Sequence, residues 1–197
     1  TFNMEREEKW VIPFIKKAGE EAGEDIAILC APWSPPAFMK NNKDMNHGGR
    51  LLRKYYGAWK HGETYGHNMI NDFNNYTEGW VDWNLILDET GGPNYAGNFC
   101  EAPIMIDTKE NKVNYNISYY YIGHFSRYIK PGAKRILCLN DSDKGVYSVS
   151  YKNPDGQIIV VVQNELSKRN RLAIAVDGKG INTEVPPHSI TTFIVTK

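Results

Sequence analysis

The chain has 197 residues, 41% hydrophobic and 23% charged, which is typical of one globular domain or two small ones. Lys plus Arg and Asp plus Glu number 23 each, so the formal net charge is zero and no strong field favours binding to nucleic acid. No apolar run approaches the roughly 20 residues that span a bilayer, and the first residues lack a signal-peptide pattern.

The first part of the chain has the order helix, strand, loop. Residues 5–22 carry apolar side chains at helical spacing, which predicts an amphipathic helix that is kinked at Pro13 or starts there. The short apolar run at residues 26–31 predicts a strand buried on both faces, and prolines between 32 and 36 end it. A helix followed closely by a buried strand is typical of parallel α/β proteins.

The middle of the chain predicts a second helix and then a strand. Residues 41–49 are polar and rich in Asn and Gly, as in a loop, and residues 50–59 are compatible with the start of a helix. Apolar side chains at helical spacing predict a helix over 63–76 that ends at Gly79. Residues 80–87 predict a strand.

A hairpin and a last helix follow. The hairpin runs through residues 102–107, a polar turn, and Val113 onward. A helix is predicted over 119–129, and Pro131 and Gly132 close it.

From about residue 133 the apolar period changes to two. The predicted strands are 136–139, 146–151, 158–163, 171–176 and 191–195. The sequence Asn-Pro-Asp-Gly at 153–156 predicts a hairpin turn between two of them. We therefore expect an antiparallel β-module that is independent of the preceding elements.

Composition and short motifs leave several interpretations open. An aromatic content of 12% suits either stacking on sugar rings or ordinary packing, and composition alone favours packing. The odd, scattered set of cysteines argues against a disulfide framework; they are Cys30, Cys100 and Cys138. Triplets that permit N-linked glycosylation, which are also frequent by chance, begin at Asn75, Asn116 and Asn140.

Three segments, taken together, resemble one known family. They are Ala-Pro-Trp-Ser-Pro-Pro-Ala-Phe-Met-Lys at 31–40; Gly-Trp-Val-Asp-Trp-Asn-Leu at 79–85 with Gly-Gly-Pro-Asn at 91–94 and Asn98; and residues 102–132 with Gly-His-Phe-Ser at 123–126. In this order they resemble the third strand, the eighth strand and the last barrel helix of family 30 glycoside hydrolases, the glucosylceramidase-like group.

The resemblance implies an α/β plus β architecture. It consists of an incomplete (β/α)8 barrel over residues 1–132 and a C-terminal antiparallel β-sandwich over residues 133–197. It also implies a retaining mechanism on β-linked glycosides, with the active site at the carboxyl ends of the barrel strands. It implies no cofactor and no metal, and it favours a secreted or extracytoplasmic location.

The same resemblance assigns substrate-pocket positions to Trp33, Trp83 and Asn98. Trp83 would form part of the wall next to the scissile bond, although a Trp after an apolar strand is more often a core residue. For Asp82 the resemblance implies a supporting hydrogen bond rather than catalysis.

The remaining polar candidates have structural explanations. The presence of an asparagine at position 94 is explained equally well by its place in a turn and by a contact with sugar. We expect His124 to be bonded within the last barrel helix. His61 and His67 show no metal-ligand spacing and no convincing partner set of Cys or carboxylate groups.

The sequence contexts of the family's two catalytic carboxylates are absent, so we assign no catalytic residue. A retaining glycosidase needs two carboxyl groups roughly 5 Å apart. The acid/base Glu would stand in an Asn-Glu-Pro context, and the nucleophile Glu would end the seventh strand. Five other acidic residues are explained as members of solvated helix or loop faces, and Asp88 and Glu89 would be nearest the mouth of the barrel; the five are Glu63, Glu78, Asp88, Glu89 and Glu101.

The family pattern also jumps between Tyr55 and Trp59, where strands four to seven would lie. A complete barrel takes roughly 250 residues, so the barrel of this chain is incomplete. Open strand edges should make it unstable unless it pairs with a complementary barrel fragment or with itself.

Three functional hypotheses follow. The first is a β-glycosidase of the glucosylceramidase type, in carbohydrate or sphingolipid-glucoside metabolism, that is inactive as this chain alone. The second is a non-catalytic carbohydrate-binding fragment, and the third is a truncated remnant.

Overall fold

The computed structural model describes residues 9, 12–23, 41, 43, 57–93, 97, 99–138, 140–141, 144–176 and 178–196. The chain divides into two compact units, residues 1–31 and 32–197. The strand expected over 26–31 and residues 50–56 of the helix start expected over 50–59 lie outside the described residues.

The helix described in the first unit is α1, Ile12–Ala22. Pro13 stands in its first turn, where a proline costs no hydrogen bond because the first backbone N–H groups of a helix have no intrahelical partner. Residues 10 and 11 lie outside the described residues, so the choice at Pro13 between a kink and a helix start stays a prediction. Gly23 follows the helix at φ +70°, a conformation that favours glycine.

Two helices of the second unit are α2, Trp59–Asn74, and α3, Ile117–Ser126. Helix α2 confirms the prediction over 63–76 but begins earlier and ends before Gly79. It ends because the backbone N–H of Asn75 turns back to the carbonyls of Asn71 and Asp72, and Tyr76 then takes φ +68°. Among the described helices, none has the length and apolarity that a bilayer crossing requires.

A small sheet has the order β1-β2-β3. Strand β1, Ile86–Asp88, pairs in parallel with β2, Ile104–Asp107, and β2 forms the expected hairpin with β3, Lys112–Tyr115. The strand predicted over 80–87 is therefore too long. Residues before Ile86 have no ladder partner among the described strands, and a strand requires a neighbour for its N–H and C=O groups.

The C-terminal part is an antiparallel sandwich of two sheets. One sheet has the order β4-β5-β6-β9 and the other pairs β7 with β8. The strands are β4 (Lys134–Ile136), β5 (Val146–Lys152), β6 (Ile158–Asn164), β7 (Asn170–Val176), β8 (Lys179–Val185) and β9 (Ser189–Val195). The predicted turn at 153–156 joins β5 to β6, and Gly156 N–H donates to the Asn153 carbonyl at 2.9 Å. Strand β8 was not predicted, because its sequence lacks the alternation of apolar residues.

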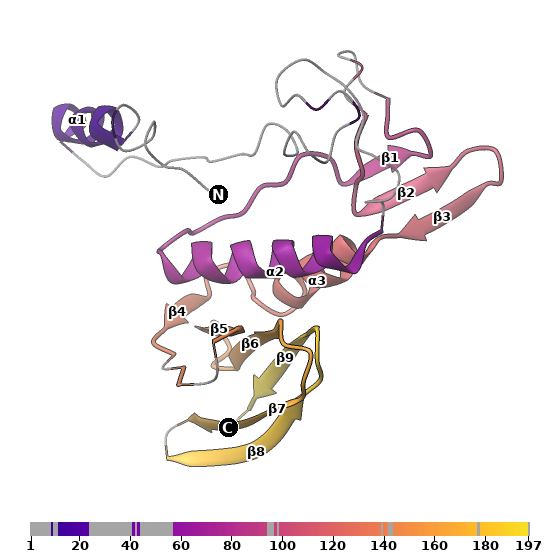
Figure 1. The fold of residues 1–197 in the computed structure, drawn as a ribbon. Helices are drawn as coiled ribbons and strands as arrows, with labels where there is room; N and C mark the ends of the chain where they lie inside the picture. The colour runs from indigo at the N-terminus through magenta and orange to yellow at the C-terminus, as the bar shows by residue number, and fades with distance from the viewer. Residues whose placement is uncertain are drawn as a thin grey trace. The chain divides into compact units, whose positions relative to one another are not determined.

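The four-stranded sheet is covered on both faces. On one face, α2 and α3 lie across it (Figure 1), and a shared core joins Met69, Ile70 and Phe73 of α2 to Phe125, Val149, Tyr151, Ile159 and Val161. On the other face, Val160 and Val162 pack with Val185 of β8. The β-module therefore packs one face of its sheet against the two helices, and its independence from the preceding elements stays a prediction.

Candidate functional site

The loop after β1 begins at Asp88 and Glu89, the carboxylates that the family resemblance places nearest the mouth of the barrel. Asp88 organises its first turn: its Oδ1 accepts hydrogen bonds from Thr90 N (2.8 Å), Thr90 Oγ1 (2.6 Å) and Gly92 N (3.0 Å). These hydrogen bonds hold the pKa of Asp88 below its usual value, and the bond from the Thr90 hydroxyl has the largest effect. Gly91 has φ +87°, and a Cβ there would lie 2.3 Å from the Cys100 carbonyl oxygen, so only glycine fits this turn.

Glu89, the other carboxylate expected near the mouth, is also an acceptor. Its Oε2 receives the backbone N–H of Thr108 at 3.0 Å, and the Thr108 hydroxyl lies 3.0 Å from the same oxygen. The backbone bond is the main cause that lowers the pKa of Glu89. A general acid requires a raised pKa. Asp88 and Glu89 therefore stabilise the loop by accepting hydrogen bonds from it.

Asp82 and Trp83 lie between α2 and β1. The Tyr65 hydroxyl of α2 donates to Asp82 Oδ2 at 2.8 Å, and Asp82 Oδ1 accepts the Trp83 backbone N–H at 2.8 Å. Burial, followed by the negative charge of Asp82, raises the pKa of Tyr65 well above its usual range, so the phenol remains a donor. Asp82 thus makes supporting hydrogen bonds, as the resemblance implies.

Trp83 is the one predicted substrate residue that the described part of the chain includes, and its side chain is 71% exposed. Trp33, Asn98 and Asn94 lie outside the described residues. Two of the three predicted substrate residues are therefore outside the described part of the chain, and the role of Trp83 stays a prediction.

Two glutamates that we assigned to solvated faces have side chains that are mostly shielded from solvent. The Glu101 side chain is 8% exposed and accepts from Gly57 N at 2.7 Å, with His61 Nδ1 at 3.1 Å. The Glu63 side chain is 7% exposed, with His188 Nδ1 at 2.8 Å. Sequence reasoning missed both because their partners are 40 or more positions away in the chain.

The histidines are structural in different ways. His67 Nδ1 lies 2.9 Å from Glu165 Oε1, so His61 and His67 each have the carboxylate partner that the sequence did not suggest. His124 Nδ1 lies 2.9 Å from Thr192 Oγ1 on β9. The expected partner within its own helix was wrong. Over the described residues, no three His, Cys, Asp or Glu side chains gather as a metal site would require.

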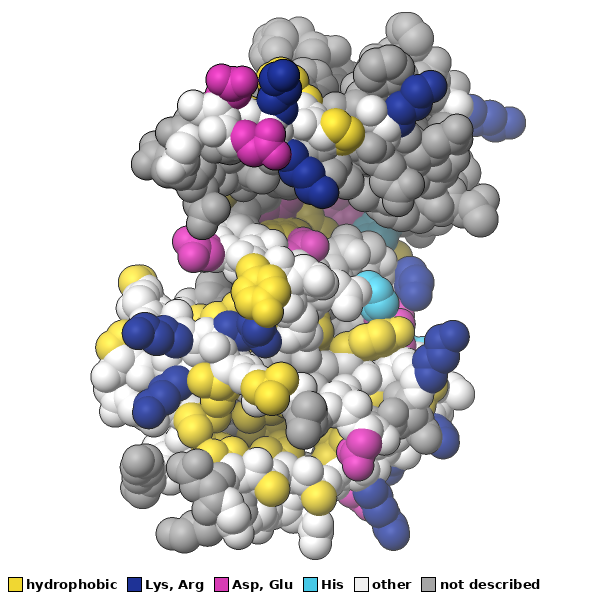
Figure 2. All heavy atoms as spheres, turned by 90° about the vertical axis from the view of Figure 1, so that its left-hand side faces the viewer, with side chains coloured by type: hydrophobic (Ala, Val, Ile, Leu, Met, Phe, Trp, Pro, Cys, Tyr) yellow, Lys and Arg dark blue, Asp and Glu magenta, His cyan; other side chains and the backbone are white. Residues whose placement is uncertain are grey.

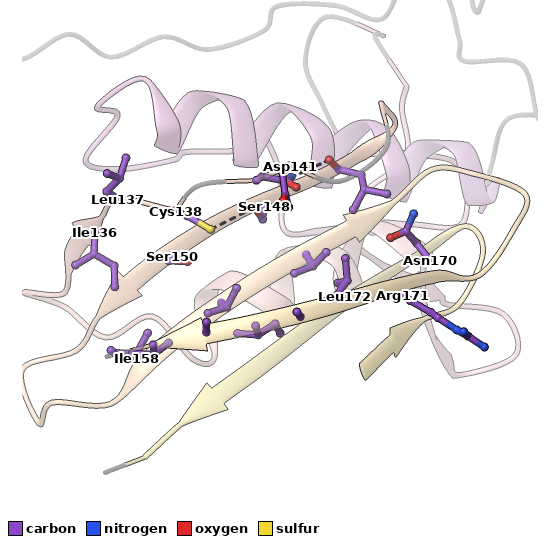
Figure 3. Close-up of a pocket in the computed structure, with 18 of the residues that line it drawn as sticks. Ile136, Leu137, Cys138, Asp141, Ser148, Ser150, Ile158, Asn170, Arg171 and Leu172 are labelled. Atoms are coloured by element: carbon purple, nitrogen blue, oxygen red, sulfur yellow. Dashed lines mark hydrogen bonds between the residues drawn. The ribbon is translucent and has the colours of Figure 1, made fainter. Parts of the chain in front are cut away.

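One groove lies in the sandwich. It has a volume of about 970 Å³ and lies between β7 and the strands β4, β5 and β6 (Figure 3). Figure 2 shows hydrophobic side chains gathered in a hollow over this part of the surface. Its lining contains aliphatic and polar residues such as Ile158, Leu172, Ser148 and Arg171 but no aromatic ring, so it offers no platform for stacking on a sugar.

Comparisons with known proteins agree with this architecture. The family model described as "Glycosyl hydrolase family 30 TIM-barrel domain" matches residues 1–55 and 52–129, and "Glycosyl hydrolase family 30 beta sandwich domain" matches residues 132–193. The chain is 34% identical to lysosomal acid glucosylceramidase of Mus musculus over 139 residues, which are 70% of this chain and 27% of that protein.

Two more distant matches also cover most of the chain. The endo-1,6-β-D-glucanase neg1 of Aspergillus fumigatus is 26% identical over 71% of this chain and 29% of its own length. The solved structure of the endo-β1,6-glucanase BT3312 superposes with a TM-score of 0.69 at 22% identity, covering 93% of this chain and 38% of that one. The chain thus spans between a quarter and two fifths of these proteins. With both family domains matched in order along its length, the chain belongs to glycosyl hydrolase family 30.

Proposed function

We propose that this chain derives from a retaining β-glycosidase of the glucosylceramidase-like group and that, alone, it does not hydrolyse glycosides. The group is supported by the mouse relative, which is named a glucosylceramidase. The extracytoplasmic location that the family resemblance favours is proposed with it, because that relative is named lysosomal. Within this proposal, residues 1–132 form a partial barrel and residues 133–197 form the β-sandwich domain. We also propose that the β-linked sugar contacts Trp33, Trp83 and Asn98.

The observation that supports the lack of hydrolysis is that the carboxylates near β1 already accept hydrogen bonds from the protein. Asp82, Asp88 and Glu89 accept hydrogen bonds from neighbouring tyrosine, threonine and backbone groups, and Glu101 accepts the Gly57 backbone N–H. Double displacement requires one carboxyl group to protonate the leaving oxygen and a second to form the glycosyl intermediate. General acid catalysis alone contributes about 10²–10⁴-fold to the rate.

Exposed apolar side chains before β1 are the argument that another polypeptide binds the barrel portion. Val81, Trp83 and Leu85 alternate outward along the segment before β1, and each is more than half exposed. Leu85 also lines a groove of about 560 Å³ beside α3. The wall of this groove includes Tyr119 and Tyr120. In a barrel, both edges of a strand are paired and its outer face is covered by helices.

We propose that this surface is completed by a polypeptide carrying the remaining barrel strands rather than by a second copy, because a second copy would bring the same strands again. Isolation of the chain from its own cells should recover it with a family 30 polypeptide that contains the Asn-Glu-Pro segment. Recovery as a monomer or a homo-oligomer would contradict this partner.

The exposure of Trp83 favours a second candidate function, a non-catalytic sugar-binding fragment. An exposed indole is a suitable stacking surface for a pyranose ring. Quenching or a shift of tryptophan fluorescence by cello-oligosaccharides or an alkyl β-glucoside, lost on Trp83→Ala, would favour it. An unchanged spectrum at saturating sugar would exclude these ligands.

The decisive assay is hydrolysis of an aryl β-glucoside and of glucosylceramide by the purified chain, with a complete family 30 β-glucosidase as the positive control. We expect no turnover above the rate of buffer alone. If turnover occurs, Glu→Gln substitutions at Glu63, Glu78, Glu89 and Glu101 are tested in turn. Loss of activity with one of them would identify a replacement carboxylate and overturn the proposal, whereas activity that survives all four would indicate a contaminating enzyme.

A further inference from the structure

The three Asn-X-Ser/Thr triplets lie in different structural environments. N-linked oligosaccharides are bulky and polar, so the folded chain must leave the modified amide facing solvent. The triplets begin at Asn75, Asn116 and Asn140. Their burial and hydrogen bonds therefore separate positions where a glycan is compatible with the fold from positions where it is not.

Asn75 satisfies this requirement. It is exposed, and Tyr76 beside it is 82% exposed. Its Nδ2 donates one hydrogen bond of 2.8 Å to the Asn71 carbonyl in the last turn of α2. Because an amide nitrogen has two hydrogens and glycosylation replaces one, this bond can persist in the modified chain. The backbone around the triplet is fixed by the Thr77 N–H, which donates to the Asp72 carbonyl at 3.1 Å.

Asn116 lies in the opposite environment. Its Nδ2 donates a 2.7 Å hydrogen bond to the carbonyl of Ala102, a residue that is 1% exposed. The third residue of its triplet, Ser118, is buried in the first turns of α3. The Asn116 amide is thus held in a partly buried contact with Ala102, so a glycan at Asn116 has less room than one on the exposed amide of Asn75.

Asn140 is exposed, but its side chain faces the protein. Its Nδ2 donates to the Val146 carbonyl at 2.9 Å in a partly buried bond, and Asn140 lines the groove between the two sheets of the sandwich. A glycan there would lie over the edge of β5 and in the groove. Among the three asparagines, Asn75 differs because the hydrogen bond of its side-chain amide goes to the end of its own helix.

The position of Asn75 is also compatible with sugar binding by the barrel. Residues 75–85 lead from the end of α2 to the start of β1, so Asn75 lies before the amino end of a strand (Figure 1). Active sites in (β/α)8 barrels lie at the carboxyl ends of the strands. Asn75 is therefore separated along the chain from the loop that follows the carboxyl end of β1.

We propose that Asn75 is the N-glycosylation site of this chain, an inference that rests on the extracytoplasmic location included in the proposed function. The test expresses the full chain behind a cleavable secretion signal in animal cells, with an added Asn-Gly-Thr triplet in a flexible C-terminal extension. Glycosylation of the extension marks the molecules that reached the lumen, and only these are scored.

We expect one further mobility shift that peptide N-glycosidase removes. Asn75→Gln and Thr77→Ala abolish that shift, whereas Thr77→Ser keeps it, and Asn116→Gln and Asn140→Gln leave it unchanged. The chain isolated from its own cells should show deamidation at Asn75 after enzymatic release of the glycan.

Lumenal molecules without the further shift, or a shift that disappears with Asn116→Gln or Asn140→Gln, would overturn the assignment of Asn75. An unmodified Asn75 in the chain from its own cells would overturn it as well. The hydrolysis assay is independent of these results, so failure of this inference and failure of the proposed lack of hydrolysis are separate outcomes.

Discussion

The hydroxyl of Tyr65 donates a 2.8 Å hydrogen bond to Oδ2 of Asp82 and so connects the middle of α2 to the segment before β1. The acceptor is a carboxylate and the phenol is partly buried, which makes this bond stronger than an exposed neutral one. It therefore fixes the segment that carries Trp83.

Loss of this bond should lower stability. Tyr65→Phe removes only the hydroxyl, and we expect the free energy of unfolding to fall by about 1.5 kcal/mol, within the range for hydrogen bonds to charged groups. Urea unfolding of Tyr65→Phe, Asp82→Ala and the double variant measures the coupling. Additive effects of the two substitutions would show that the bond contributes nothing to stability.

Gly66 should tolerate no side chain. A Cβ at this position of α2 would lie 1.9 Å from Gln163 Oε1 and 2.8 Å from Tyr121 Cδ1. We expect Gly66→Ala to destabilise the chain by about 1–3 kcal/mol through overpacking. The matched control is Gly123→Ala in α3, where a Cβ would have no neighbour within 4 Å. Higher helix propensity should stabilise that variant by about 0.5–1 kcal/mol, so equal effects at both positions would contradict the packing seen here.

The buried Glu63 should depend on its partner in the turn between β8 and β9. His188 Nδ1 lies 2.8 Å from Glu63 Oε1, whereas Lys60, a highly exposed side chain, approaches only to 3.7 Å. We expect His188→Ala to lower the free energy of unfolding by about 1–3 kcal/mol, because a buried acceptor loses its partner. Lys60→Ala should change it by less than about 1 kcal/mol, as for surface ion pairs. Thermal unfolding of both variants at neutral pH compares them, and a larger effect at Lys60 would reverse the assignment.

His124 should make the chain less stable in mild acid. Burial lowers its pKa in the folded chain below the usual 6.5. The unfolded chain therefore binds a proton at a higher pH than the folded chain does, and the free energy of unfolding falls as the pH decreases through 6.5. It levels off below the lowered pKa. In urea unfolding between pH 7.5 and 5, His124→Gln should reduce this decrease. Parallel curves for the two proteins would show that His124 does not contribute.

The sequence predicted the elements whose residues carry their own signal. The helical spacing of apolar residues predicted α2 and α3, and the turn at 153–156 predicted the β5–β6 hairpin. The strand predicted over 80–87 was too long because its apolar residues do not reveal whether a neighbour is present. Strand β8 was missed because its stability depends on pairing with β7 and on the burial of Val185, which is 0% exposed.

Local motifs by themselves determined the family, the order of barrel elements before sandwich strands, and the absence of the two catalytic carboxylate contexts. Only the tertiary structure decided how polar residues are used. Glu63 and Glu101 became partners of His188 and His61, and His124 found its partner on β9. The physical reason is range: helix, turn and strand signals arise from neighbouring residues, whereas the burial of a charge depends on side chains brought from distant parts of the chain.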